Sequence, residues 1–256
     1  MKNKRLLFLI PFSVLTACNG TKEIDGNKAK EIVDAIRNKS NKEIPNNLTF
    51  DLINKGQSGQ GEARFEVDLT YKYQIAKNGY YTMLKGSQAG QRYDVEMYCI
   101  KGTLHGEVKY VRYFDEAKND YVHAVATSKD SADYETAFDE LDADRIIRIY
   151  RNYAKVNVFD VVDDPWDTRK YYSSKEGELI LEWTTDLKEG TSYSYAETAV
   201  SGKNTYKFED YLFTSVHNET VSTLGNTWLT DGKVDYKTEV KLELPSNWEA
   251  YIQLEA

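Results

Sequence analysis

The chain is 256 residues long and acidic, with 33 basic and 41 acidic side chains and a net charge of −8. This balance argues against a nucleic-acid ligand and against a surface that lies flat on anionic lipid, because both require an excess of positive charge. The length is sufficient for one large domain with its own hydrophobic core.

Residues 1–17 have the organisation of an export signal. A basic segment (residues 2–5) precedes an apolar run, Leu6–Val14, which is shorter than the ~20 residues of a transmembrane helix but suits a signal peptide. The run ends in Leu15-Thr16-Ala17-Cys18, which resembles the lipobox of bacterial lipoproteins, where the cysteine is acylated and becomes the new N-terminus. An ordinary secretory signal with a chance cysteine is the alternative.

The lipobox implies a protein held at the extracytoplasmic face of a cell membrane by acyl chains on Cys18, since two or more such chains anchor stably. Without residues 1–17 the chain loses three basic and no acidic residues, so its net charge becomes −11. Only Cys99 then remains beside the lipidated cysteine, and no intramolecular disulfide is expected. Residues 18–27 are predicted to form a short, flexible tether, and residues 28–256 a single domain.

The first predicted element is an amphipathic helix. Ala29, Ile32, Val33 and Ile36 recur at helical spacing, with charged residues on the other side. The pattern ends around residues 38–40, before Pro45.

A series of antiparallel strands follows. Apolar and polar residues alternate strictly over residues 65–75, which indicates a strand with one buried and one wet face. Asn78-Gly79 supplies a hairpin turn before a returning strand at residues 80–85. Further strands are predicted at residues 93–99, 107–114 and 121–127.

The pattern then changes to helical spacing between residues 131 and 156, where two consecutive helices are predicted as an insertion. A loop is expected over residues 160–174. Strands resume at residues 179–183, 193–195, 205–217 and 221–230, and the clearest alternation of this half is at residues 234–244. The layout predicts an α+β fold: a large curved antiparallel sheet, or half-barrel, with helices packed on its concave face.

This layout resembles the LolA/LolB-type lipoprotein carriers and the related mycobacterial lipoproteins of the LppX and LprG type. The resemblance lies in the lipobox, the short tether, the first helix and the sheet interrupted by helices, over most of residues 28–245. It implies an incomplete barrel around a hydrophobic cavity with helices as a lid. No family motif beyond Leu15–Cys18 is matched, so no binding residue is carried over by position.

The sequence contains no catalytic or phosphate-binding motif, and no cofactor or metal is expected. The histidines at 105, 123 and 217 are far apart and are interpreted as surface or packing residues. Cys99 alternates with apolar residues and is interpreted as a buried, inert thiol. The acidic cluster at residues 160–167 lacks the spacing of a calcium loop and is interpreted as a solvated loop.

The leading hypothesis is therefore a non-enzymatic envelope lipoprotein that binds a lipid or lipid-linked molecule between sheet and helices. Ile146, Ile147, Tyr150 and Ala154 are the candidate lining residues, with a solid core as the alternative for each. The second hypothesis is a surface module that binds a protein or glycan through aromatic side chains. Its candidate residues are tyrosines of one hairpin and one loop: Tyr71, Tyr73, Tyr80, Tyr81, Tyr171 and Tyr172.

Overall fold

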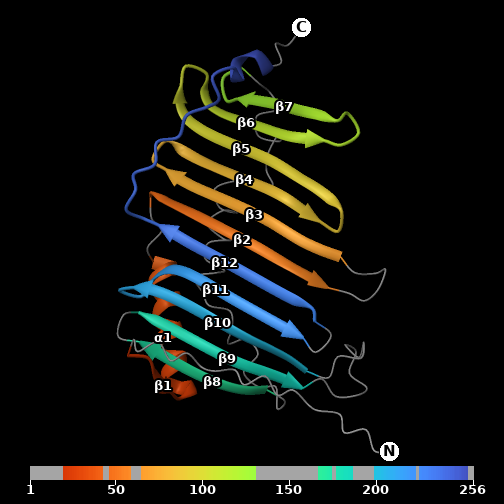
Figure 1. Ribbon diagram of the computed structural model, residues 1–256. Helices are drawn as coiled ribbons and strands as arrows, with labels where there is room; N and C mark the ends of the chain where they lie inside the picture. Colours follow the sequence, from red (N-terminus) through yellow and green to blue (C-terminus); the bar gives the residue numbers. More distant parts are fainter. Residues whose placement is uncertain are drawn as a thin grey trace, which may run out of the picture.

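The computed structural model describes residues 20–42, 46–58, 65–130, 167–174, 177–186, 199–222 and 225–252. Within these ranges the chain forms one twelve-stranded antiparallel sheet and one α-helix (Figure 1). The sheet is curved and does not close into a barrel, because its outermost strands do not pair with each other. The predicted α+β class with a large, open antiparallel sheet is confirmed.

The strand order across the sheet is β1-β8-β9-β10-β11-β12-β2-β3-β4-β5-β6-β7. The strands are β1 (Lys22–Ile24), β2 (Leu48–Ser58), β3 (Phe65–Ala76), β4 (Gly79–Gln88), β5 (Gln91–Thr103), β6 (Gly106–Asp115), β7 (Asp120–Thr127), β8 (Asp167–Ser174), β9 (Glu178–Asp186), β10 (Ala199–Glu209), β11 (Leu212–Ser222) and β12 (Thr227–Asp235).

The sheet consists of two meanders, β2 to β7 and β8 to β12, joined where β12 pairs with β2. Strands β7 and β8 follow one another in the sequence but lie near opposite edges of the sheet (Figure 1). The N-terminal strand β1 extends the second meander by pairing with β8.

Helix α1 (Gly26–Lys42) begins where Asp25 caps it, since the Lys28 amide donates to Asp25 Oδ1 at 2.8 Å. It continues past the predicted end at residues 38–40, because polar residues can extend a helix beyond its apolar stripe. Lys39 and Lys42 lie in the last turn, where positive charge favours the helix dipole.

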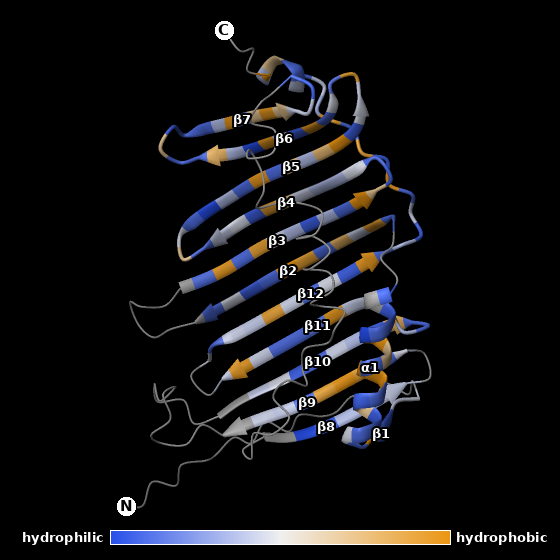
Figure 2. Cartoon of the chain, turned by 180° about the vertical axis from the view of Figure 1, so that it is seen from behind, coloured by the Kyte–Doolittle hydropathy of each residue, from blue (hydrophilic) through white to orange (hydrophobic). Residues whose placement is uncertain are grey.

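The apolar stripe of α1 packs on one face of the sheet, as predicted. Ala29, Val33 and Ile36 are at most 1 % exposed and belong to the same core as Phe50 and Val216. Figures 1 and 2, which view the sheet from opposite sides, place α1 beside β8 to β11. We call the sheet face that carries α1 the core face, and the opposite face the polar face.

Two predictions about the ends of the second meander are wrong. Lys22–Ile24 forms β1 within the predicted tether, and Asp167–Ser174 forms β8 within the predicted loop. Both strands are short and mostly polar, so neither shows the alternation that signals a strand. Strand β1 pairs with β8, and β8 pairs with β9. Ile24 and Tyr171 pack at the margin of the core. Strand β2 was not predicted, although Leu48, Phe50 and Leu52 are all buried.

The predicted strand at residues 205–217 is in fact a hairpin. Strands β10 and β11 meet at a turn in which Asp210 and Tyr211 have φ of 48° and 61°. Left-handed conformations are uncommon for a tyrosine, and this turn contains no glycine, so the hairpin had no clear turn signal in the sequence.

The predicted strand at residues 234–244 is wrong beyond Asp235, where β12 ends. Residues 236–251, which we call the C-terminal strap, run across the ends of the first meander to the short helix η4 (Trp248–Tyr251) beside β7 (Figure 1). Asn47 holds the strap by donating to Thr238 O at 2.6 Å and accepting from the Val240 amide at 2.7 Å. Leu242 is buried in a second, smaller core.

Candidate functional site

The residues predicted to line a cavity, Ile146, Ile147, Tyr150 and Ala154, lie outside the described residues, as do Cys18 and the whole of the predicted helical insertion at residues 131–156. Of the acidic cluster only Asp167 is described, and it lies in β8 rather than in a loop.

Adjacent rows of paired residues cross the first meander on the core face. Residues paired directly across neighbouring strands point to the same face, so the pairings define each row. One row is almost wholly buried and is part of the main core. It consists of Tyr73, Thr82, Met97, Val111 and Ala124.

The next row, two residues along each strand, is equally apolar but only partly buried. We call it the apolar row; its members are Tyr71 (β3), Leu84 (β4), Val95 (β5), Tyr113 (β6) and Val122 (β7). All five keep part of their surface exposed, and Tyr113 is 37 % exposed. Covering apolar side chains of this size with another apolar group is favourable because it removes their surface from water. This strip is therefore suited to an apolar ligand.

The sequence analysis placed all five of these residues in predicted strands but did not identify them as neighbours. Tyr71 and Val95 lie in strands predicted by alternation, yet they are brought together only through the pairing of β3, β4 and β5. The sequence does not show which row is buried and which is half-exposed, because this depends on the register of the strands.

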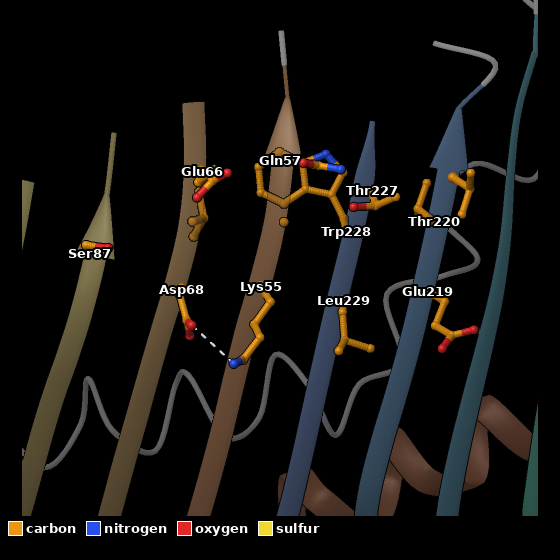
Figure 3. A pocket seen from close by; sticks show the side chains of 13 residues that line it. Lys55, Gln57, Glu66, Asp68, Ser87, Glu219, Thr220, Thr227, Trp228 and Leu229 are labelled. Atoms are coloured by element: carbon orange, nitrogen blue, oxygen red, sulfur yellow. Dashed lines mark hydrogen bonds and ion pairs between the residues drawn. The ribbon is translucent and has the colours of Figure 1, made fainter. Parts of the chain in front are cut away.

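A groove of about 570 Å³ crosses β4, β3, β2, β12 and β11 at one end of the strands (Figure 3). Most of its lining side chains belong to the polar face, and Lys55 forms an ion pair with Asp68 at 3.1 Å inside it. Glu66 and Glu219 add further negative charge. A charged, solvated lining does not suit an acyl chain, so the groove does not provide the predicted hydrophobic cavity.

Charged and aromatic side chains interlock elsewhere on the polar face. Arg112 lies 3.1 Å from Glu96 and 3.6 Å from Asp94, and its guanidinium covers the ring of Tyr121. Burial alone would raise the pKa of Asp94, but the hydrogen bond that Tyr121 donates at 2.5 Å and the nearby cations lower it overall. This network explains how a half-buried carboxylate stays ionised, and it cross-links β5, β6 and β7.

Each of the three histidines is hydrogen-bonded to a neighbouring side chain. His105 bonds Asp130 and meets Trp248 edge-on, His123 bonds Tyr110 Oη at 2.7 Å, and His217 bonds Asp231 at 2.5 Å. Cys99 is 1 % exposed, and burial together with Glu107 raises the pKa of its thiol to about 12. Within the described ranges no group of three or more His, Cys, Asp and Glu side chains is arranged to hold a metal ion.

Half of the tyrosines proposed as an exposed binding surface are buried. Tyr73, Tyr80 and Tyr81 are each at most 8 % exposed, whereas Tyr71, Tyr171 and Tyr172 are half-buried. None of the six is fully exposed, so they do not form an exposed aromatic patch.

No protein-family model matches the chain, and no curated protein matches it in sequence. A structural comparison finds a domain described as outer membrane lipoprotein-sorting, from Vibrio parahaemolyticus, with 4 % identity and a TM-score of 0.26 over 88 % of this chain and 98 % of that one. The YwiB protein of Bacillus subtilis follows with 8 % identity and a TM-score of 0.14 over 75 % and 93 % of the two chains. Similarities this low carry no argument about this chain.

Helix α1 is neither long enough nor apolar enough to cross a bilayer, and the part of the chain that is described contains no other candidate span.

Proposed function

We propose that this chain is an envelope lipoprotein, anchored through acyl chains on Cys18, that binds a lipid or lipid-linked molecule against the apolar row. The observation that carries the proposal is the row itself. Five apolar side chains, one from each strand of β3 to β7, lie side by side and remain partly exposed on the face that otherwise forms the core.

The row has the dimensions and chemistry of an acyl-chain site. Four strand spacings give it a length of about 19 Å. Each methylene that a ligand buries there contributes ~0.8 kcal/mol. Contiguous exposed apolar surface on a soluble face commonly marks a binding site.

The first strand of the sheet lies close to the predicted anchor. Strand β1 begins at Lys22, so residues 19–21 are all that separate this edge of the sheet from Cys18. Such a segment spans on the order of 10 Å when fully extended. The apolar row begins at β3, seven strands further along the sheet, so the anchor would hold the β1 edge at the membrane while the row extends away from it.

A non-enzymatic role fits the chemistry of the described residues. The Cys99 thiol is buried with a raised pKa, and each of the three histidines is engaged in structural contacts. The alternative, a surface module that uses exposed tyrosines, is weakened because three of its six candidate tyrosines, Tyr73, Tyr80 and Tyr81, are buried.

Lipid extraction tests the proposal. The chain lacking residues 1–18, purified from a membrane-containing host, is expected to release bound lipid into organic solvent, as detected by mass spectrometry. Tyr113→Gln, which makes the row polar, should reduce the yield, whereas Lys72→Gln on the opposite face should not. An empty extract from the unmodified domain would contradict the proposal.

A further inference from the structure

A second row on the core face is polar, although it adjoins the main core. It crosses the sheet one step beyond the buried residues Leu52 and Val216, and each member pairs directly with the next. We call it the amide row; its members are Asn204 (β10), Asn218 (β11), Thr230 (β12) and Asn54 (β2).

Two amides of this row have unused hydrogen-bonding capacity. Within the described part of the chain, Asn54 Oδ1 and Asn218 Oδ1 are buried and accept no hydrogen bond. Buried polar atoms in proteins are nearly always paired, and these two lie on one face, on strands separated only by β12. Two buried acceptors in one row indicate a partner that donates hydrogen bonds and is not part of the described chain.

The amide row meets the apolar row at Tyr71. Burial raises the pKa of the Tyr71 hydroxyl, while a hydrogen bond with Asn54 acts in the opposite direction. The Asn54 amide oxygen has no hydrogen-bond partner among the described residues, so it remains available beside Tyr71. An uncharged polar strip and an apolar strip are thus continuous on one face, which matches an amphiphilic ligand.

Tryptophans flank the amide row on its other side. Trp183 pairs with Gly202 and Trp228 with Gly56, and each ring lies over the glycine of the neighbouring strand. A Cβ would lie 2.4 Å from the Trp183 ring at Gly202 and 2.5 Å from the Trp228 ring at Gly56, so both positions require glycine. Trp228 is 40 % exposed and crosses β2 near Gln57 (Figure 3). Flat aromatic rings beside amides can stack on sugar rings.

The absence of charged side chains from these rows restricts the ligand further. Between β9 and β3 neither the amide row nor the row of Trp183 and Trp228 contains a charged side chain. A phosphate headgroup would find no counter-charge there, and as a pure acceptor it would not satisfy Asn54 Oδ1 or Asn218 Oδ1. Hydroxyl groups would satisfy both.

We infer that the amide row binds the uncharged, hydroxyl-bearing headgroup, a glycerol or a sugar, of an amphiphile whose acyl chains lie on the apolar row. The inference rests on the proposed function and specifies its ligand class. It assigns Asn54 and Asn218 as acceptors for hydroxyl groups.

Photo-cross-linking with matched lipids tests the inference. The full lipoprotein is reconstituted in phosphatidylcholine vesicles that contain a trace of one diazirine-labelled dioleoyl lipid: diacylglycerol, glucosyl-diacylglycerol or phosphatidic acid. The cross-linked fraction is measured for the unmodified protein, for the double variant Asn54→Leu/Asn218→Leu and for Gln74→Leu, an amide replacement on the polar face. Asn218→Leu alone replaces the double variant if that one does not fold.

A hydroxylated lipid is expected to cross-link about tenfold more than phosphatidic acid, which corresponds to one or two hydrogen bonds. The double variant should lose this preference and Gln74→Leu should retain it. Preference for the glucosyl lipid would identify a sugar, and preference for diacylglycerol a glycerol hydroxyl. Equal labelling by all three lipids, or unchanged preference in the double variant, would overturn the headgroup inference alone. No labelling by any lipid would contradict the proposed function itself.

Discussion

Asn78, in the turn between β3 and β4, is joined to Leu242 of the C-terminal strap by two hydrogen bonds. Its amide nitrogen donates to Leu242 O at 2.7 Å, and its amide oxygen accepts from the Leu242 amide at 3.4 Å. Asn47 holds Thr238 and Val240 in the same manner. Two asparagine side chains therefore supply bonds that a neighbouring strand would otherwise provide.

Asn78→Ala should loosen the strap and lower the free energy of unfolding by about 1–3 kcal/mol, because the Leu242 backbone groups lose their partner in a partly buried site. Urea denaturation measures the change. Lys77→Ala in the same turn is the control, since its ion pair with Glu239 joins side chains that are both 83 % exposed and should contribute little. Equal destabilisation by the two variants would show that the asparagine bonds do not hold the strap.

The strap also shows what sequence alternation does and does not reveal. Alternation reports burial on one side, so it correctly marked Leu242 as buried but could not distinguish a ladder strand from a segment held by Asn47 and Asn78. Conversely, the polar strand β8 gave no signal, although its pairing with β9 is as regular as any other. The apolar and amide rows depend on register across several strands, which no local pattern encodes.

Cys99 should react slowly with thiol reagents in the native protein, and reductant should leave the melting temperature unchanged. The thiol is 1 % exposed and its pKa is raised to about 12, so the reactive thiolate is scarce at neutral pH. A Cys99→Ala/Leu104→Cys variant should react at once, because Leu104 is 90 % exposed. Labelling of native Cys99 as fast as that of the variant would contradict its burial.

The ion pairs of His217 should make stability depend on pH. The hydrogen bonds that the protonated His217 ring donates to the Asp231 and Glu219 carboxylates raise its pKa above its ordinary 6.5. The stabilisation is therefore fully present below 6.5 and is lost as the pH rises through the higher folded-state value. His217→Gln should destabilise the protein near pH 6 and have a smaller effect at alkaline pH, with a modest amplitude because the side chain is 43 % exposed. A pH-independent difference between the two melting curves would argue against the charged pair.

Lipidation is predicted at Cys18. Mass spectrometry of the membrane-extracted protein should show a new N-terminus at this residue carrying acyl chains, and Cys18→Ala should abolish the modification. Cys99→Ala is the matched control and should remain acylated and membrane-bound. An unmodified Cys18 in the native protein, or cleavage elsewhere, would contradict a lipid anchor at this residue.

The most direct test of a lipid ligand on the core face is photo-cross-linking from adjacent positions of β6 in the membrane-anchored full chain. The photoreactive residue p-benzoylphenylalanine replaces either Tyr113, in the apolar row, or Phe114, whose side chain points to the polar face beneath Arg92. Both residues are aromatic and adjacent in the strand, so the two variants differ mainly in the face of the sheet on which the photoreactive side chain lies. A lipid-sized mass adduct is expected at position 113 and none at position 114. No adduct at 113, or equal adducts at both positions, would contradict a lipid ligand on the core face.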